Sequence, residues 1–313
     1  MTALRRTALL LPISLAAALT FGQGVSAVGG ERFSPAAYVT ENSRLLVFPS
    51  NQQSFTIPIP LNSRYVAFGA AGRTLYVTAF KKSGTTFTND PGIFKIDLQP
   101  VKITRLAGLE SFSAVDRLAV SKSEEVVVFA ARVANASACG IYALNLADAK
   151  RRTVLENPDC RGLGWPWRII DVSLDAKSAL MLFDHRLAVL DLTDGKITSV
   201  GRQLWGGSYS PNGKWIAALE LAGPQIPSRT TLIDSQNFDR LRDLGGLNDD
   251  EVVWSPDSKF ILHCVPKSNC AGNGPLALEA LDVATGQRTL VKDTSCRIGV
   301  SRYIGWVRSD LGK

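Results

Sequence analysis

The stretch Tyr209-Ser210-Pro211-Asn212-Gly213-Lys214-Trp215-Ile216-Ala217-Ala218 decides the fold. Proline fixes φ at the second position of a turn, while serine suits the first position, asparagine the third and glycine the fourth. The stretch therefore predicts a strand end, a type I turn and a new buried strand. A second copy, Trp254-Ser255-Pro256-Asp257-Ser258-Lys259-Phe260-Ile261-Leu262, repeats the pattern. Because one hairpin is marginally stable whereas a series can share a core, the repetition indicates stacked β units.

Weaker copies extend this pattern along the chain at a spacing of 37 to 52 residues. The positions equivalent to Ser210, called anchors below, are Gly69, Ser121, Ser173, Ser210, Ser255 and Val307. A second signature follows each of the first five anchors, an Asp or Asn in an apolar run before a turn, which is a hairpin signal. Its members are Asp97, Asn145, Asp191, Asp234 and Asp282. Each unit thus offers about four strands, and these Asp residues are expected to satisfy turn amides locally.

The chain ends complement each other. The last anchor, Val307, has almost no sequence after it, whereas Ala37–Val39, Leu45–Phe48 and Phe55–Ile59 are strands without an anchor. We expect Tyr303–Val307 to pair with these N-terminal strands in one shared unit. Such pairing closes a ring and removes the exposed edges that an open array would leave.

The anchor residues carry a resemblance to a known family. Ser-Pro-Asn-Gly-Lys-Trp-Ile-Ala and Trp-Ser-Pro-Asp-Ser-Lys-Phe-Ile resemble the repeat of TolB-like, WD40-like propellers, also called the PD40-type repeat. The resemblance covers roughly Glu31 to Lys313. It implies an all-β chain forming a six-bladed β-propeller of four-stranded antiparallel blades.

The first residues have the pattern of an export signal. Arg5 and Arg6 form a positive region, Ala8–Phe21 is apolar, and Val25-Ser26-Ala27 is a small-residue cleavage site. We therefore predict a signal peptide at 1–27, a propeller domain at 28–313 and a periplasmic or secreted location. The paired arginines leave twin-arginine export open.

Charge limits the partners. Removing Arg5 and Arg6 with the leader lowers the net charge from +7 to +5, and Lys and Arg are scattered among Asp and Glu. We read this mild charge as a solubility feature and expect no nucleic-acid partner. No apolar run of spanning length follows the leader, so we expect no membrane span after cleavage. A monomer is expected.

The repeat also suggests how the five cysteines pair. In two units one cysteine precedes the third strand and another follows the fourth, so antiparallel folding brings them to the same end. We predict disulfides Cys139–Cys160 and Cys270–Cys296, with Cys264 as a buried thiol. A Cys264–Cys270 bond is the rival pairing.

Catalytic and metal-binding patterns are weak. The two histidines, His185 and His263, are expected to be structural, because Asp184 and His185, as sequence neighbours, point to opposite faces. The acidic run Asn248-Asp249-Asp250-Glu251 offers oxygen ligands but lacks the spacing of a calcium loop. We therefore predict no catalytic residue, no metal site and no cofactor.

A basic and aromatic patch is the candidate binding site. Arg161-Gly162-Leu163-Gly164-Trp165-Pro166-Trp167-Arg168 lies where one blade connects to the next, a place that in propellers typically faces the mouth of the central channel. Tryptophan faces stack on sugars or aromatic groups, and arginine pairs with acids. Alternatively, the tryptophans fill the gap between blades. The candidate residues are Arg161, Trp165, Trp167, Arg168, Arg202, Trp205, Arg297 and Arg302.

These features favour a non-catalytic binding module at the cell envelope, whose partner is an envelope protein or a small ligand. Loops on a rigid frame carry function, so the mouth is the expected site. Two alternatives stay open. One is a metal-assisted propeller hydrolase resembling lactonases, with Asp or Glu ligands and His263; the other is a propeller with a structural role in the envelope.

Overall fold

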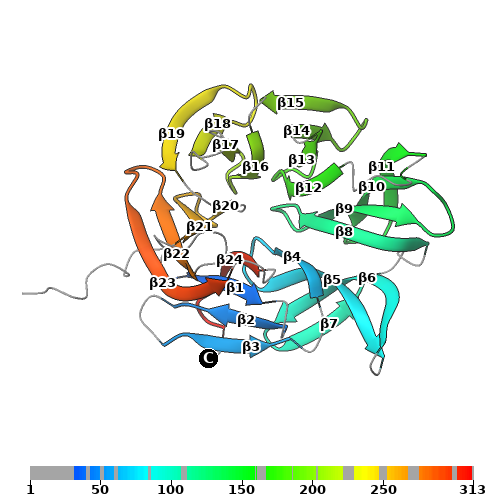
Figure 1. Ribbon diagram of the computed structural model, residues 1–313, viewed down its shortest axis with the longest axis horizontal. Coiled ribbons are helices and arrows are strands. Elements are labelled where there is room, and N and C mark those ends of the chain that lie inside the picture. The colour runs from blue at the N-terminus through cyan, green and yellow to red at the C-terminus, as the bar shows by residue number, and fades with distance from the viewer. Residues whose placement is uncertain are drawn as a thin grey trace, which may run out of the picture.

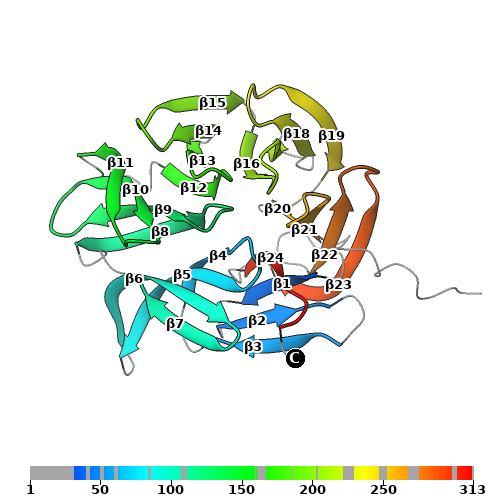
Figure 2. The same cartoon turned by 180° about the vertical axis from the view of Figure 1, so that it is seen from behind.

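Six four-stranded antiparallel sheets surround a common axis in the computed structural model of the chain (Figure 1). The view from behind shows the same ring (Figure 2). Among the described residues every regular element is a strand. The described residues are 32–39, 43–49, 53–59, 63–83, 86–106, 111–158, 160, 167–184, 186–201, 204–220, 229–246, 252–266, 275–297 and 302–311.

The first three blades are given from the axis outward. Blade I consists of β24 (Arg302–Arg308), β1 (Phe33–Val39), β2 (Arg44–Val47) and β3 (Phe55–Pro58). Blade II consists of β4 (Ser63–Phe68), β5 (Thr74–Ser83), β6 (Thr86–Leu98) and β7 (Val101–Arg105). Blade III consists of β8 (Phe112–Val120), β9 (Val126–Val133), β10 (Cys139–Asn145) and β11 (Arg151–Asn157).

The other three blades have the same order. Blade IV consists of β12 (Trp167–Val172), β13 (Ser178–Phe183), β14 (Arg186–Asp191) and β15 (Ile197–Gly201). Blade V consists of β16 (Leu204–Tyr209), β17 (Trp215–Glu220), β18 (Arg229–Asp234) and β19 (Arg240–Gly246). Blade VI consists of β20 (Val252–Trp254), β21 (Phe260–Pro266), β22 (Pro275–Asp282) and β23 (Arg288–Arg297).

Blade I closes the ring as predicted. The C-terminal strand β24 pairs antiparallel with β1 over seven positions, from Phe33 with Arg308 to Val39 with Arg302. Figure 1 shows β24 in red beside β1 in blue. Trp306 and Phe48 lie in the same buried cluster. The two ends of the chain therefore share one sheet, which completes the sixth blade and closes the ring.

The hydrophobic core is divided among the contacts between blades. Each of six buried clusters draws its residues from two neighbouring blades. The cluster between blades V and VI, for example, joins Leu219 and Leu232 to Trp254 and Ile261. At about 25 cal/mol per Å² of buried apolar surface, a blade gains its stability mainly from its neighbours. The physical reason for the ring is confirmed: a single blade cannot cover its own apolar faces.

The anchor turn has the geometry expected from its residues. The Gly213 N–H donates to the Ser210 carbonyl at 2.9 Å. The Ser210 hydroxyl accepts the Trp215 N–H at 2.9 Å and donates to Asn212 Oδ1 at 2.8 Å. Gly213 has φ of +71°, the left-handed region that glycine adopts without strain. The anchors Ser121, Ser173 and Ser255 make the same bond to the first residue of the next strand.

The second signature also caps a turn. The carboxylate of Asp282 accepts the N–H groups of Ala284 and Thr285 at 2.8 and 2.9 Å. Asp191 accepts the Thr193 N–H in the same way. The predicted local role of these side chains is thus confirmed at the positions where the bonds are seen, including Asn145, which accepts the Ala147 N–H.

Candidate binding site at the channel mouth

The ring has two unlike faces, defined by the direction of the inner strands β4, β8, β12, β16, β20 and β24. On the turn face, each inner strand ends in an anchor turn. On the connection face, the chain arrives from the preceding blade and the inner strand begins. Because blades are antiparallel, the second-signature hairpins also lie on the turn face.

The turn face is held together by bonds within and between blades. Within blade V the Ser235 N–H donates to the Lys214 carbonyl, and the equivalent bond recurs in blades II, III, IV and VI. Between blades, Glu124 accepts the Ala71 N–H at 2.8 Å, and Ser258 accepts the Asn212 N–H at 3.1 Å. These links fix the frame on the turn face.

The connection face gathers a different set of residues. Counting back five residues from each anchor reaches Arg64, Asp116, Arg168, Trp205, Asp250 and Arg302. Five of these six lie in the inner strands, four of them at the first or second residue and Asp116 in the middle of β8, and successive inner strands contact one another around the ring. Arg168 and Trp205, which occupy the adjacent strands β12 and β16, are half-buried. The described part of this level therefore carries one arginine and one tryptophan, and the side chains of the other four positions lie outside the described residues.

The candidate residues take different places in the structure. Trp167 and Arg168 are the first residues of β12, and Trp205 is the second residue of β16, so these three lie in inner strands rather than in the connections before them. Arg297 ends β23 and Arg302 begins β24; their side chains are outside the described residues. Also outside the described residues are Arg161, Trp165 and Arg202.

The two described tryptophans pack against the frame. Trp167 is only 5% exposed and belongs to the cluster between blades III and IV. Trp205 packs against the cluster between blades V and VI, and its buried indole N–H meets no acceptor among the described residues. Both tryptophan rings therefore pack into the frame. Among the described candidates, the half-buried Arg168 is the one with a charged side chain.

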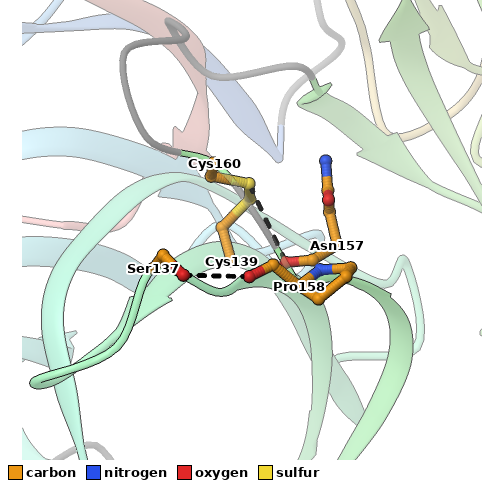
Figure 3. The surroundings of a disulfide bond; sticks show 5 residues. All are labelled: Ser137, Cys139, Asn157, Pro158 and Cys160. Carbon is orange, nitrogen blue, oxygen red and sulfur yellow. Dashed lines mark hydrogen bonds between the residues drawn. A yellow bond between two sulfur atoms is a disulfide. The ribbon is translucent and has the colours of Figure 1, made fainter.

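A disulfide fixes the beginning of the connection between blades III and IV (Figure 3). Cys139, the first residue of β10, is bonded to Cys160, as predicted. The Cys160 N–H donates to the Ser137 carbonyl at 2.8 Å, and the Ser137 hydroxyl donates to the Pro158 carbonyl at 3.1 Å. Both cysteines are buried in the cluster that holds Trp167. The bond therefore ties the patch segment to the core.

The second predicted disulfide, Cys270–Cys296, stays a prediction. Cys270 and the side chains of Cys264 and Cys296 lie outside the described residues. One detail differs from the expectation: Cys296 lies within β23, opposite Leu276 of β22, rather than after the last strand of its blade.

The channel contains a cavity of about 110 Å³ lined by residues of all six inner strands. Three charged side chains line it: Arg117, Lys122 and Asp171. Lys122 Nζ lies 2.9 Å from Asp171 Oδ1, and these side chains are 18% and 10% exposed. Asp171 Oδ2 also accepts the Ser208 hydroxyl at 2.7 Å and the Tyr209 N–H at 2.8 Å. This carboxylate therefore links blades III, IV and V on the turn side of the channel.

Burial has the largest influence on the pKa of Tyr209, whose N–H binds Asp171. Burial raises the pKa of Tyr209 to about 12, with a smaller contribution from the nearby charge of Asp171, although the bond to the Ser178 hydroxyl acts in the opposite direction. Tyr209 thus stays neutral at physiological pH and serves as a packing residue.

Sequence reasoning missed Arg117. It lies four residues before the anchor Ser121, directly after Asp116. The connection that leads into its strand carries no aromatic patch like the one before Arg168. The available signal was the alignment of the anchors, because counting back four residues places Tyr65, Arg117, Ile169 and Tyr303 at one depth.

The predicted metal and histidine features have these outcomes. Among the described residues, no group of three or more His, Cys, Asp or Glu side chains is placed to hold a metal ion. His263 is fully buried within β21 rather than at its end. His185 and 248–251 lie outside the described residues. In the part of the chain that the structure describes, no helix is long and apolar enough to cross a membrane.

Comparison with known proteins places the fold. The sequence matches no protein-family model and no curated protein. Its structure resembles TolB from Acinetobacter baumannii with a TM-score of 0.63 and 13% identity, over 90% of this chain and 67% of that one. It resembles a putative TolB from Agrobacterium tumefaciens with a TM-score of 0.59 and 12% identity, over 88% and 98%. Oligogalacturonate lyase from Vibrio parahaemolyticus gives 0.57 and 10%, over 83% and 74%.

These similarities confirm the architecture predicted from the repeats. The chain is a six-bladed β-propeller of four-stranded antiparallel blades, of the kind seen in TolB structures. Because the same fold also appears in a lyase, the fold by itself does not choose between binding and catalysis.

Proposed function

We propose that the protein is an exported, non-catalytic binding module that takes a protein partner or a small ligand at the channel mouth on its connection face. The observation that carries this proposal is the contrast between the faces. Repeat residues and their hydrogen bonds stabilise the turn face, whereas the connection face has the half-buried Arg168 and Trp205 in two adjacent inner strands. A rigid frame with a variable basic and aromatic rim is typical of a binding surface.

Export is supported by two features. The leader pattern at 1–27 predicts cleavage near Val28, and the Cys139–Cys160 disulfide is consistent with an oxidising compartment. Signal cleavage is tested by N-terminal sequencing of the protein recovered from the periplasm and from the medium. A chain recovered only from the cytoplasm with Met1 retained would reject export.

Site-specific photo-crosslinking tests the binding face. A photoreactive amino acid replaces Arg168 at the mouth in one variant and Leu174 in another, since Leu174 is 41% exposed in the anchor turn of the same blade. We expect a discrete adduct from envelope extract or live cells at position 168 and none at position 174. Equal adducts at both positions, or none at position 168, would reject the mouth as the site.

Substitution gives the complementary test. We expect Trp165→Ala combined with Arg168→Ala to weaken partner capture by at least about tenfold, since losing a hot-spot residue typically costs more than 1 kcal/mol. Leu174→Ala is the matched control on the turn face. Unchanged capture by a double variant with a normal unfolding transition would count against the proposal.

The enzymatic alternative rests on one observation, the similarity to oligogalacturonate lyases, one of them a complex with manganese. The enzyme that the sequence leaves open is a metal-assisted hydrolase or lactonase-like enzyme, and the lyases show only that the same fold can carry catalysis. Elemental analysis of the purified protein decides between the two: stoichiometric metal, with an activity lost on chelation, would favour the enzyme.

A further inference from the structure

The inner strand of blade III is irregular at the channel. In the β8–β9 ladder, Val115 pairs with Ala131 and Leu118 pairs with Phe129. Asp116 and Arg117 therefore stand opposite the single residue Ala130, which is the arrangement of a β-bulge. A bulge bends its strand and re-aims a side chain, and bulges are common next to functional sites. Arg117 lines the channel cavity, as Tyr65, Ile169 and Tyr303 do at the same distance from their anchors.

The other charges on the cavity wall are already paired. Asp171 binds Lys122, and it also accepts two hydrogen bonds from blade V. Arg117, in contrast, has no hydrogen bond or ion pair with any residue that the structure describes. The described wall thus carries one uncompensated positive charge, on a half-buried guanidinium. A cation held in a partly desolvated cavity favours an anion from solution.

The size and charge of the cavity select the anion. An engineered cavity of about 150 Å³ holds benzene, so a volume of about 110 Å³ suits a ligand somewhat smaller than a six-membered ring. It accommodates a carboxylate with one or two carbon atoms beyond it. Guanidinium pairs with a planar carboxylate through two parallel hydrogen bonds. Because Lys122 is paired with Asp171, a dianion such as phosphate would find one unpaired cation among the described wall residues.

We propose that the channel is a carboxylate-binding site in which Arg117, a cavity-lining residue at the β8 bulge, holds one carboxylate group that enters from the connection face. This inference deepens the proposed function, on which it rests, by naming the chemistry of the ligand. The carboxylate belongs either to a small organic acid or to an acidic side chain of a partner segment that enters the mouth. The apolar walls from Val66 and Ile304 suit the short chain behind the group.

The experiment follows the Nε–Hε signal of Arg117 by NMR in the mature protein during titration at constant ionic strength. The probes are acetate, propionate, inorganic phosphate and the blocked peptide acetyl-Gly-Glu-Gly-amide. We expect a saturable shift with at least one carboxylate probe and a weaker response to phosphate. Saturation by acetate or propionate identifies a free acid as the ligand. Saturation by the peptide alone identifies an acidic side chain.

Matched variants assign the effect to Arg117. Affinity in Arg117→Gln, measured by calorimetry, should fall at least tenfold, because truncating one partner of a close charge pair typically costs about 2 kcal/mol or more. Arg186→Gln removes the same charge from an exposed position in β14 and should leave affinity unchanged. If Arg117→Gln does not fold, Arg117→Lys keeps the charge and should lose several-fold in affinity, because lysine lacks the bidentate fork.

Two results would overturn the inference. One is a wild-type protein that binds none of the carboxylate probes, and the other is equal carboxylate binding by wild type and the Arg117 variants. Partner capture at position 168 is measured separately. Its persistence in Arg117→Gln, together with absent carboxylate binding, would reject the carboxylate site and leave the proposed binding face standing.

Discussion

The turn face and the connection face of this propeller differ in how far their residues repeat from blade to blade. On the turn face, one pattern recurs from blade to blade: a serine hydroxyl accepts the first N–H of the next strand at Ser121, Ser173, Ser210 and Ser255. On the connection face, the six equivalent positions hold arginine, aspartate or tryptophan, so the residue type does not repeat from blade to blade. The residues that repeat between blades build the structural frame. The positions whose residues differ between blades are available for recognition.

The same contrast appears along each inner strand. Residues next to an anchor pack between blades, as Tyr209 and Trp254 do. Farther from the anchor, bulges interrupt the pairing of the inner strands in blades II, III, IV and V. The strand is therefore regular where it builds the ring and irregular where it approaches the mouth.

The largest expected effect on stability comes from Asp171, on the turn side of the channel. Asp171→Ala removes the carboxylate shared by Lys122, Ser208 and Tyr209. Removing one member of a buried pair leaves the other uncompensated and costs about 3–5 kcal/mol in the free energy of unfolding. Urea unfolding measures this loss. Asp239→Ala, at an exposed carboxylate, should change stability by less than about 0.5 kcal/mol; a similar small change for Asp171→Ala would contradict its linking role.

The connection face has one strong covalent restraint. Replacing Cys139 and Cys160 together by alanine opens a loop with a sequence separation of 21 residues. Chain entropy assigns such a loop about 3 kcal/mol in the free energy of unfolding. Thermal unfolding should show this loss of stability when the double variant is compared with oxidised wild type. Wild type unfolded with and without reductant is the control, and a double variant as stable as oxidised wild type would show that the bond does not restrain the connection.

Ser210→Ala tests whether the anchor hydroxyl is structural. It leaves the Trp215 N–H without its acceptor, and an unsatisfied buried donor costs about 1–3 kcal/mol. Ser199→Ala, at an exposed position in β15, should be nearly neutral. Chemical denaturation of the two variants compares them directly. An effect at Ser199 equal to that at Ser210 would remove the distinction between frame and surface.

The smallest expected effect concerns pH. Hydrogen bonds from the Thr193 and Thr285 N–H groups hold the pKa values of Asp191 and Asp282 below the ordinary value of 3.8. A lowered folded-state pKa means that the stabilisation is complete above that ordinary value and is lost as the pH falls below it.

Asparagine, which the chain itself uses at position 145 in the same role, removes this dependence. We therefore expect Asp191→Asn with Asp282→Asn to unfold with a shallower pH dependence below pH 3.8 than wild type does. Thermal unfolding from pH 3 to 7 measures this, and parallel curves would disprove the capping role.

The candidate site was less predictable than the frame. Arg168 could be placed near the mouth by counting from Ser173, but the burial of Trp167 could not, because the orientation of a strand's first residue depends on the blade beside it. Arg117 was missed for a similar reason. Counting from the anchors gives its depth, but only the arrangement of the six inner strands shows that it lines a cavity together with the Lys122–Asp171 pair.

The sequence by itself determined the repeat, the number of blades, the closing of the ring by both chain ends and the Cys139–Cys160 bond. These features depend on local turn chemistry and on apolar periodicity, which are written within each unit. The tertiary structure alone decided that Asp171 joins three blades and that Arg117 faces the channel. The reason is physical: charge pairing and side-chain direction at the axis depend on distances between strands that lie far apart in the sequence.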